Sequence, residues 1–230
     1  MTGLPEHLFT DPVRQSLATR HRHFAIGDGD ALRYPADVAP FATCPPHKTA
    51  MQQLSSLLAP GESVWIFANG HLSIAGLDFE RTLDCFQMVL PSNVAVQDVC
   101  AQIVPLDETH ASEMIALTNI AFPGFFRART CQMGSYFGVR NSDGALIAMA
   151  GERLMLDRYP EISGVCTHPD HRGRGLAAAL IARLVDEHRR RGLVSWLHVS
   201  CSNQRAIELY QRFGFEIARK VPLLLVTQRG

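Results

Sequence analysis

The stretch Glu161-Ile-Ser-Gly-Val-Cys-Thr-His-Pro-Asp-His-Arg-Gly-Arg-Gly-Leu-Ala177 decides the fold class. It begins as an apolar strand, continues into a loop that holds two glycines, and enters an alanine-rich helix directly. Glycines remove side-chain bulk, so several backbone N–H groups can converge on one anion, and the helix N-terminus adds unpaired donors and a favourable dipole. The stretch therefore predicts an anion cradle, and we expect the anion to be a pyrophosphate.

Two of the three cofactor classes that use such a cradle fit this loop poorly. A Walker A loop requires Lys-Ser/Thr after its second glycine, whereas Leu176-Ala177 follows here, so that class is excluded. Gly173-Arg-Gly175-Leu-Ala-Ala178 could be a variant of the dinucleotide fingerprint. That fold also needs an acidic residue at the end of the next strand, and the expected strand Val194–Ser200 is followed by Cys201-Ser202.

The third class is coenzyme A, and here the sequence resembles the GNAT superfamily of N-acetyltransferases over about residues 101–228. The family's signature, Arg/Gln-x-x-Gly-x-Gly/Ala, is matched by Arg172-Gly-Arg-Gly175-Leu-Ala177. The motif Asn203-x-x-Ala206-x-x-x-Tyr210 and then Phe213-Gly-Phe215 follow it. The segment Val165-Cys-Thr-His-Pro169 resembles sequences of a bacterial branch called FR-type or glycine-N-acyltransferase-like.

The resemblance implies an N-acyltransferase that moves an acetyl group from the cosubstrate acetyl-CoA to a primary amine of a small molecule or amino acid. The amine attacks directly in a ternary complex, and no metal takes part. A non-catalytic CoA-binding regulatory module and an O-acyltransferase remain the alternatives. A panel of small amines, with free thiol as the readout, separates them.

The resemblance also assigns residues to the cofactor. The strand end would splay from its neighbour at a bulge and hydrogen-bond the pantetheine, and the N–H of Val165 is our candidate for polarising the thioester carbonyl. The side chain of Cys166 alternates to the opposite face, so we expect it to pack in the core and not to act as a nucleophile. The predicted cofactor-binding residues are Val165, Cys166, Thr167, Arg172, Gly173, Arg174, Gly175, Leu176, Ala177, Asn203, Ala206 and Tyr210.

Tyr210 is the candidate general acid. It follows Asn203 by seven residues, nearly two helical turns, so both side chains point towards one ligand while the small Ala206 lets that ligand approach. A phenol with a pKa near 10 is protonated at neutral pH and can give its proton to a departing thiolate. The structural alternative is a core tyrosine beside Phe213.

Glu161 is the candidate general base. Alternation along the strand places it on the same face as Ser163 and Val165, and it matches the position of the glutamate that serves as base in some family members. Glu152 in the preceding strand is a rival, and deprotonation through water is the third possibility.

The expected elements give an α/β (α+β) fold with a GNAT-like mixed central sheet flanked by helices. A change of composition near residues 91–98 divides the chain into an N-terminal α/β domain, 1–98, and a GNAT N-acetyltransferase domain, 99–230. We expect 1–98 to be a degenerate second GNAT-like copy or a lid that shapes the acceptor pocket. In the second part we expect strands over 101–106, 136–140, 145–156, 161–167 and 194–200, helices over 107–122, 125–133, 176–191 and 203–213, and a final pair of strands over 215–227.

Composition argues against several partners. Lys+Arg and Asp+Glu number 22 each, so the basic surplus of a nucleic-acid binder is missing. We expect no membrane span and no secretory signal. Six scattered cysteines suit free thiols in a reducing cytosol, which predicts a cytoplasmic protein. His168 and His171 are close but have no companion ligands, so no metal site is expected.

The acceptor is expected to be a small-molecule amine. The segment 122–133 lies where the family's acceptor-side helices usually are, and it contains Phe125, Phe126, Arg127 and Arg129. Aromatic rings plus arginine could suit an acceptor that carries a carboxylate, and ordinary helix packing explains the same residues equally well. The oligomeric state is not predicted.

Overall fold

The computed structural model describes residues 9–67, 76–92, 94 and 101–229. In this part of the chain ten strands form one sheet, in the order β1-β2-β3-β10-β4-β9-β8-β7-β6-β5. The pairs β2–β3 and β8–β9 are parallel and the remaining described strand pairs are antiparallel, so the predicted mixed sheet is confirmed. The strands are β1 (Leu32–Arg33), β2 (Phe41–Thr43), β3 (Ser63–Phe67), β4 (Leu77–Val89), β5 (Ile103–Leu106), β6 (Tyr136–Arg140), β7 (Leu146–Leu156), β8 (Tyr159–Thr167), β9 (Trp196–Ser200) and β10 (Glu216–Gln228).

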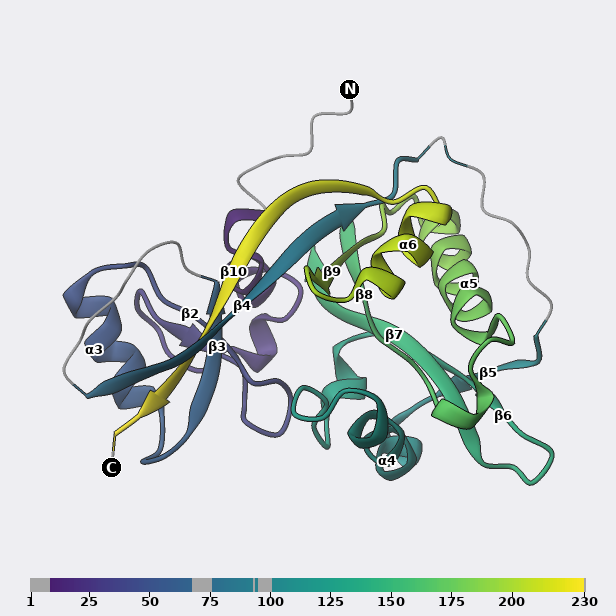
Figure 1. Ribbon diagram of the computed structural model, residues 1–230. Helices are drawn as coiled ribbons and strands as arrows, with labels where there is room; N and C mark the ends of the chain where they lie inside the picture. Colours follow the sequence, from purple (N-terminus) through teal and green to yellow (C-terminus); the bar gives the residue numbers. More distant parts are fainter. Residues whose placement is uncertain (1–8, 68–75, 93, 95–100, 230) are drawn as a thin grey trace.

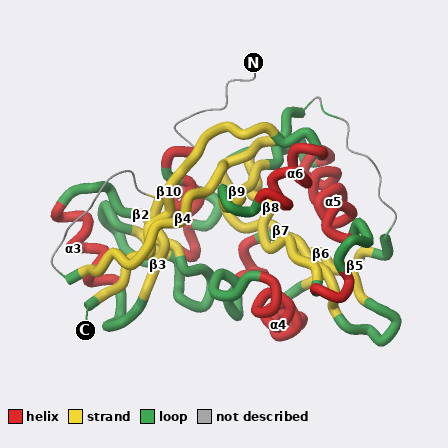
Figure 2. The backbone as a smooth tube through the Cα atoms, viewed as in Figure 1, coloured by secondary structure: helices red, strands yellow, loops and turns green. Residues whose placement is uncertain are grey.

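Helices cover both faces of the sheet, and Figure 2 shows them gathered on either side of the band of strands. Apolar side chains of α5 and α6 pack on one face of β6–β9, and those of α2 and α4 pack on the other. Among the described residues no helix is both long and apolar enough to span a membrane. The α-helices are α2 (Pro12–Ala18), α3 (Lys48–Leu57), α4 (Ala111–Ala121), α5 (Leu176–Arg190) and α6 (Gln204–Arg212), and the 3-10 helices are η1 (Arg22–Phe24), η2 (Glu108–His110), η3 (Thr130–Met133) and η4 (Pro169–His171).

The expected helix over 125–133 is wrong in most of its length, because only η3 forms there. The Thr130 hydroxyl accepts a hydrogen bond from the N–H of Arg127 at 2.7 Å and donates one to the Val38 carbonyl at 2.6 Å. Side-chain and long-range bonds thus replace the i→i−4 bonds of a helix. The segment is fixed against the N-terminal part of the chain.

The long strands β4 and β10 join the two parts of the chain. Figure 1 shows them running side by side from the end of the molecule near α3 to the end near α6. β4 lies between β10 and β9, with Cys85 opposite Ser200 and Val89 opposite Trp196. The expected final pair of strands is therefore wrong: residues 216–228 form one strand, and its neighbour in the sheet precedes the expected boundary. The proposed division at residue 98 and the second-copy idea stay predictions, and the sheet runs across that boundary.

Side chains of β4 alternate between two cores. Cys85 and Val89 join the cluster that also contains Phe41 and Trp196, whereas Met88 joins the cluster under α5 and α6. N-terminal residues therefore supply a large part of the apolar packing on the α2 and α4 face. That face also forms one wall of the cavity in which the predicted site residues lie.

Candidate active site

The glycine loop has the backbone of an anion cradle. Gly173 and Gly175 have φ of +79° and +74°, in the left-handed region that glycine adopts without a Cβ penalty. Helix α5 begins at Leu176, immediately after the loop. Among the described residues no hydrogen bond uses the backbone N–H groups of 173–178, and a Cβ at Gly173 would meet nothing within 4 Å. Several unpaired donors therefore surround a space that a phosphate could fill.

Strand β8 bulges and leaves its neighbour just before this loop. Gly151 lies opposite Ser163 and Met149 opposite Cys166, so Gly164 and Val165 share one position of β7. Gly164 has φ of +64°. The pairing of β8 with β9 includes only Glu161 and Ile162, and beyond them the two strands diverge. The bulge and the splayed strand end follow the arrangement that the resemblance implied.

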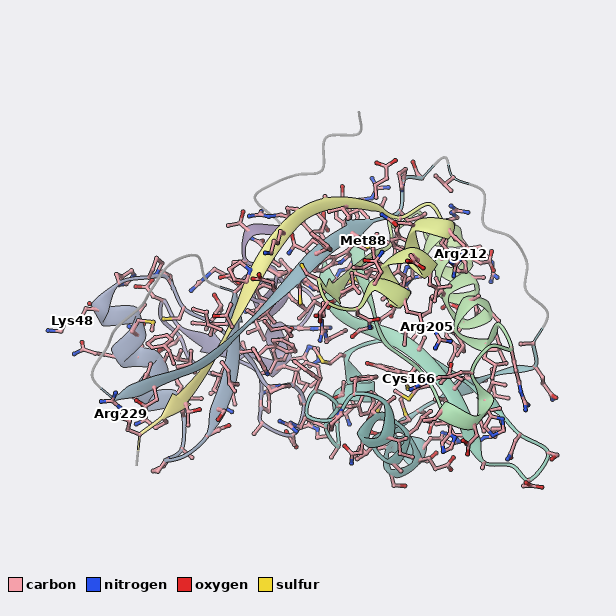
Figure 3. All side chains as sticks on the ribbon, viewed as in Figure 1. Lys48, Met88, Cys166, Arg205, Arg212 and Arg229 are labelled. Carbon is pink, nitrogen blue, oxygen red and sulfur yellow. The ribbon has the colours of Figure 1, made fainter. Side chains whose placement is uncertain are left out.

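A cavity of about 640 Å³ passes through the sheet where β8 and β9 diverge. Its lining includes Ile162 and Tyr210 from the α5 and α6 face, and Cys85 and Arg153 from the opposite face. In Figure 3 the labels of Cys166, Arg205 and Arg212 lie around this part of the molecule, and those of Lys48 and Arg229 lie at its other end. All twelve residues that were predicted to bind the cofactor line the cavity, and Glu161 does not.

The side of the cavity next to the glycine loop, which is the predicted cofactor side, is positively charged. Arg172, Arg174, Arg205 and Arg212 line it, and no aspartate or glutamate is among the described lining residues. The Nδ1 atom of His171, another lining residue, is buried without a hydrogen-bond partner among the described residues. This charge, together with the unpaired amides, fits the phosphates of coenzyme A.

Tyr210 lies in the cavity wall with 7% of its surface exposed, and its ring contacts Phe215 edge-on at 5.9 Å. The expected alternative neighbour was Phe213. No described residue hydrogen-bonds the Tyr210 hydroxyl. Burial raises the pKa of Tyr210, so the phenol is protonated at neutral pH. Asn203 caps α6, with its Oδ1 accepting from the N–H of Ala206 at 3.2 Å.

The carboxylate of Glu161 is fully engaged beneath the cavity. It accepts hydrogen bonds from Arg153 Nε at 2.9 Å and Nη2 at 2.5 Å, from the Leu154 N–H at 3.2 Å, and from His198 Nδ1 at 2.7 Å. Burial alone would raise its pKa, but the Arg153 charge and the His198 hydrogen bond outweigh burial and lower the pKa to about 2. Its base role stays a prediction, and the geometry favours a positioning role instead.

The rival carboxylate, Glu152, faces away from the cavity. Its oxygens accept hydrogen bonds from His188 Nε2 at 2.8 Å and from the Ser135 N–H at 2.8 Å, on the α5 side of β7. Burial raises its pKa, but the His188 and Ser135 hydrogen bonds outweigh that effect, and the pKa is lowered. Neither glutamate is poised to accept a proton near neutral pH.

His198 connects Glu161 to the cavity that it lines. The Gln87 amide nitrogen lies 3.0 Å from the Phe9 carbonyl, to which it must donate, and 3.1 Å from His198 Nε2. His198 Nε2 is therefore the acceptor, and the Nδ1–H donates to Glu161. Burial lowers the pKa of His198 despite the nearby carboxylate, so the ring is neutral at neutral pH.

Sequence reasoning missed most of the cavity wall opposite the cofactor side. Phe125 and Phe126 line the cavity as the segment suggested, but Arg127 and Arg129 do not. Arg129 forms an exposed ion pair with Asp37 at 3.3 Å. The lining residues missed on this wall include Phe41, Leu83, Cys85, Tyr136, Arg153, His198 and Leu223. The alternation of side chains along each strand predicts which residues share a face of the sheet. No local sequence pattern predicts which strands become neighbours.

Among the described residues no group of three or more His, Cys, Asp or Glu side chains could hold a metal ion. Burial raises the pKa of the Cys166 thiol to about 12, and the side chain packs in a core cluster with Met114 and Met149. Cys166 therefore lines the cavity as a protonated thiol.

Known proteins share this architecture. The family model "Acetyltransferase (GNAT) family" matches residues 105–215. The crystal structure of a putative acetyltransferase from the GNAT family of Novosphingobium aromaticivorans is 34% identical, with a TM-score of 0.87, and the match covers 97% of this chain and 100% of that chain. The chain belongs to the GNAT family of acetyltransferases. Its place in this acyltransferase family confirms the coarser part of the sequence prediction.

Further relatives of this GNAT chain match it over shorter stretches. The [ribosomal protein bS18]-alanine N-acetyltransferase of Escherichia coli K12 is 36% identical over 77 residues, which are 33% of this chain and 51% of the relative. The L-amino acid N-acyltransferase MnaT of the same strain is 39% identical over 66 residues, 28% of this chain and 38% of the relative. The chain thus spans about half the length or less of these curated relatives. The likeness to a glycine-N-acyltransferase-like branch stays a prediction.

Proposed function

We propose that this GNAT protein is an acetyl-CoA-dependent N-acetyltransferase acting on the primary amine of a small molecule or amino acid. The observation that carries the proposal is the cavity through the sheet. It brings the unpaired amides of 173–178, the bulge at Gly164-Val165 and the Tyr210 hydroxyl to one space. Two reactants can therefore enter from opposite faces and meet, which direct transfer in a ternary complex requires.

The cosubstrate would be held mainly by backbone. The amides of 173–178 suit its pyrophosphate, and Arg172, Arg174, Arg205 and Arg212 supply compensating charge. The strand end Val165-Cys166-Thr167 would bind the pantetheine. A thioester supplies an activated acyl group, and an N–H donor at Val165 would stabilise the negative charge that develops on its carbonyl oxygen.

Tyr210 would return a proton to the departing thiolate, because its phenol is protonated, lines the cavity and has no described partner. The amine needs a proton acceptor as well. Glu161 and Glu152 are weak bases because their pKa values are lowered, their oxygens are engaged in hydrogen bonds, and both lie outside the lining, so we infer that water in the cavity takes this proton. Glu161 then fixes the orientation of Arg153 and His198.

Two measurements test the proposal. Calorimetry should show that the protein binds CoA, and thiol release from acetyl-CoA should depend on an added amine. Uptake without release for any amine or alcohol would identify a binding module, and release with alcohols alone would identify an O-acyltransferase. Absence of CoA uptake by folded protein would end the assignment.

A variant pair tests the acid. Tyr210→Phe should lower kcat by about 10²–10⁴-fold, the usual contribution of a general acid, with an unchanged Kd for CoA. Tyr159→Phe is the matched control, because Tyr159 does not line the cavity. An unchanged kcat for Tyr210→Phe, under conditions where chemistry limits the rate, would remove Tyr210 from the mechanism.

A further inference from the structure

The cavity lining divides by chemistry at the sheet. Four arginines line the cofactor side. The wall on the α2 and α4 side is mainly apolar and largely aromatic, and its apolar members come from β2, β4, β6, β10 and the segment before η3. Its apolar members include Phe41, Leu83, Phe125, Phe126, Tyr136 and Leu223, and Thr130, Arg153 and His198 are its polar members.

The aromatic wall is preformed, because its rings are packed against one another. Phe125 stacks on Phe41 with centroids 6.1 Å apart and on Trp65 at 5.5 Å. Phe126 meets Tyr136 edge-on at 5.6 Å. Rings fixed in this way present a rigid apolar surface to an occupant, so little side-chain freedom is lost on binding.

The aromatic wall ends at the β8 bulge, where we propose that the acyl group is transferred. The Tyr136 ring lies across Gly151 and beside Gly164, where a Cβ would be 3.4 Å from Tyr136 Cε1. Gly164 is the first residue of the bulge whose second residue, Val165, is the proposed carbonyl-polarising donor. An occupant whose apolar group contacts the wall would therefore have its other end at the bulge.

No unbalanced charge faces this half of the cavity from the described residues. Arg153 is the only described cation on this side of the lining, and Glu161 neutralises it through two hydrogen bonds. His198 is neutral, and Arg127 and Arg129 lie outside the cavity. The wall offers neither a carboxylate for a second ammonium group nor an unpaired cation for a carboxylate.

The size of the cavity limits the occupant further. About 640 Å³ is within the usual range of about 300–1,000 Å³ for one small-molecule site, and here the pantetheine must share it. What remains suits a compact molecule.

We propose that the acceptor is a small primary monoamine that carries an uncharged aromatic group, bound with its ring against Phe125, Phe126 and Tyr136. This inference rests on the proposed N-acetyltransferase function and narrows its substrate class. It excludes free amino acids and diamines as preferred acceptors, because a second charge would have to be buried against the aromatic wall without a partner.

The test uses four matched probes on the unaltered protein: 2-phenylethylamine, ethylamine, L-phenylalanine and 1,4-diaminobutane. We expect kcat/KM for 2-phenylethylamine to exceed that of each other probe at least about tenfold, the scale on which apolar pockets discriminate. We also expect 2-phenylethylamine, and not ethylamine, to change the tryptophan fluorescence of the protein without acetyl-CoA, because Trp65 stacks on Phe125. Equal or better use of any other probe, or no fluorescence response, would overturn the inference and leave the enzyme class intact.

A variant set locates the effect. Phe125→Ala should raise KM for 2-phenylethylamine about tenfold and leave the CoA Kd unchanged, and Phe125→Leu should restore part of the loss. Phe79→Ala is the control, since Phe79 is a half-buried phenylalanine that packs beside the α3 cluster, away from the cavity. An unchanged KM for Phe125→Ala would contradict the placement of the ring. Absence of CoA uptake would instead contradict the proposed function itself.

Discussion

The two sides of the cavity are built in opposite ways. The predicted cofactor side depends on a contiguous loop, 173–178, whose backbone supplies the donors, whereas the proposed acceptor side is assembled from strands and loops between Phe41 and Leu223. The geometry of a contiguous loop can be predicted from the sequence, because it follows from two glycines and the start of a helix. The assembled wall forms only when β4 lies between β9 and β10 in the folded sheet. The difference predicts which changes destroy the whole site and which affect one side.

Removal of residues 1–98 should have the largest effect. The fragment 99–230 lacks β4 and would leave the facing edges of β9 and β10 without partners, and it would expose Trp196 and Val221 of the shared core. We expect no cooperative thermal transition by circular dichroism and no CoA binding. Co-expression of residues 1–98 as a separate chain is the control, and it should restore both. A fragment that is folded and fully active on its own would support the independent domain at 99–230 and contradict an essential role for the first part.

Glu161→Gln should have the next largest effect, on stability. It leaves the Arg153 charge buried without its counter-ion, and loss of one partner of such a pair costs about 3–5 kcal/mol. Chemical denaturation should show this loss at pH 7. Glu187→Gln on α5 is the control, since its i,i+4 pair with Arg183 is worth only about 0.2–0.5 kcal/mol.

The same carboxylate predicts a pH dependence. Folding lowers the pKa of Glu161 from 4.5 to about 2, so its contribution to stability is complete above pH 4.5 and is lost as the pH falls from 4.5 towards 2. The shift corresponds to about 3 kcal/mol. The stability of the Glu161→Gln variant should therefore vary less across this window than that of the unaltered protein. Parallel curves for the two proteins would show that Glu161 is not held ionised.

Gly173→Ala tests the cofactor side of the cavity. The left-handed φ should cost about 1 kcal/mol of stability, and the added methyl group projects into space that the protein leaves empty. We expect the Kd for CoA to rise at least about tenfold, measured by calorimetry, because the methyl group blocks the approach of phosphate to the amides. Gly144→Ala in the β6–β7 turn has a similar φ of +84° and also meets nothing within 4 Å, so it should lose stability alone. Equal CoA affinity in both variants would place the phosphate elsewhere.

The sequence predicted those elements whose structure depends on interactions between residues that are close in the chain. The strand, glycine loop and helix over 161–190, the β6–β7 hairpin and the helix over 204–212 follow from periodicity and turn residues, and they lie close to the expected bounds. The single prediction of twelve cofactor-binding residues rested on the family resemblance, whose motifs lie in these segments. The role of β4 was not predictable, because pairing across more than a hundred residues leaves no mark on either strand. The partners of Glu161 were missed for a different reason: Arg153 approaches at a β7 bulge that shifts the strand register, and His198 comes from the next strand.

The smallest expected effect tests the acceptor side through a residue that the sequence made attractive. Arg129 lies four residues from Phe125, and from the sequence alone it could have bound an acceptor carboxylate. In the structure its guanidinium pairs with Asp37, with 44% of the Arg129 side chain exposed, and the residue does not line the cavity. Arg129→Ala should therefore leave KM unchanged for every amine, L-phenylalanine included, and an exposed pair of this kind contributes at most about 1 kcal/mol to stability. Phe125→Ala, four residues earlier, serves as the positive control. If Arg129→Ala raised KM for L-phenylalanine alone, this arginine would reach the acceptor during turnover, and the uncharged acceptor class would be wrong.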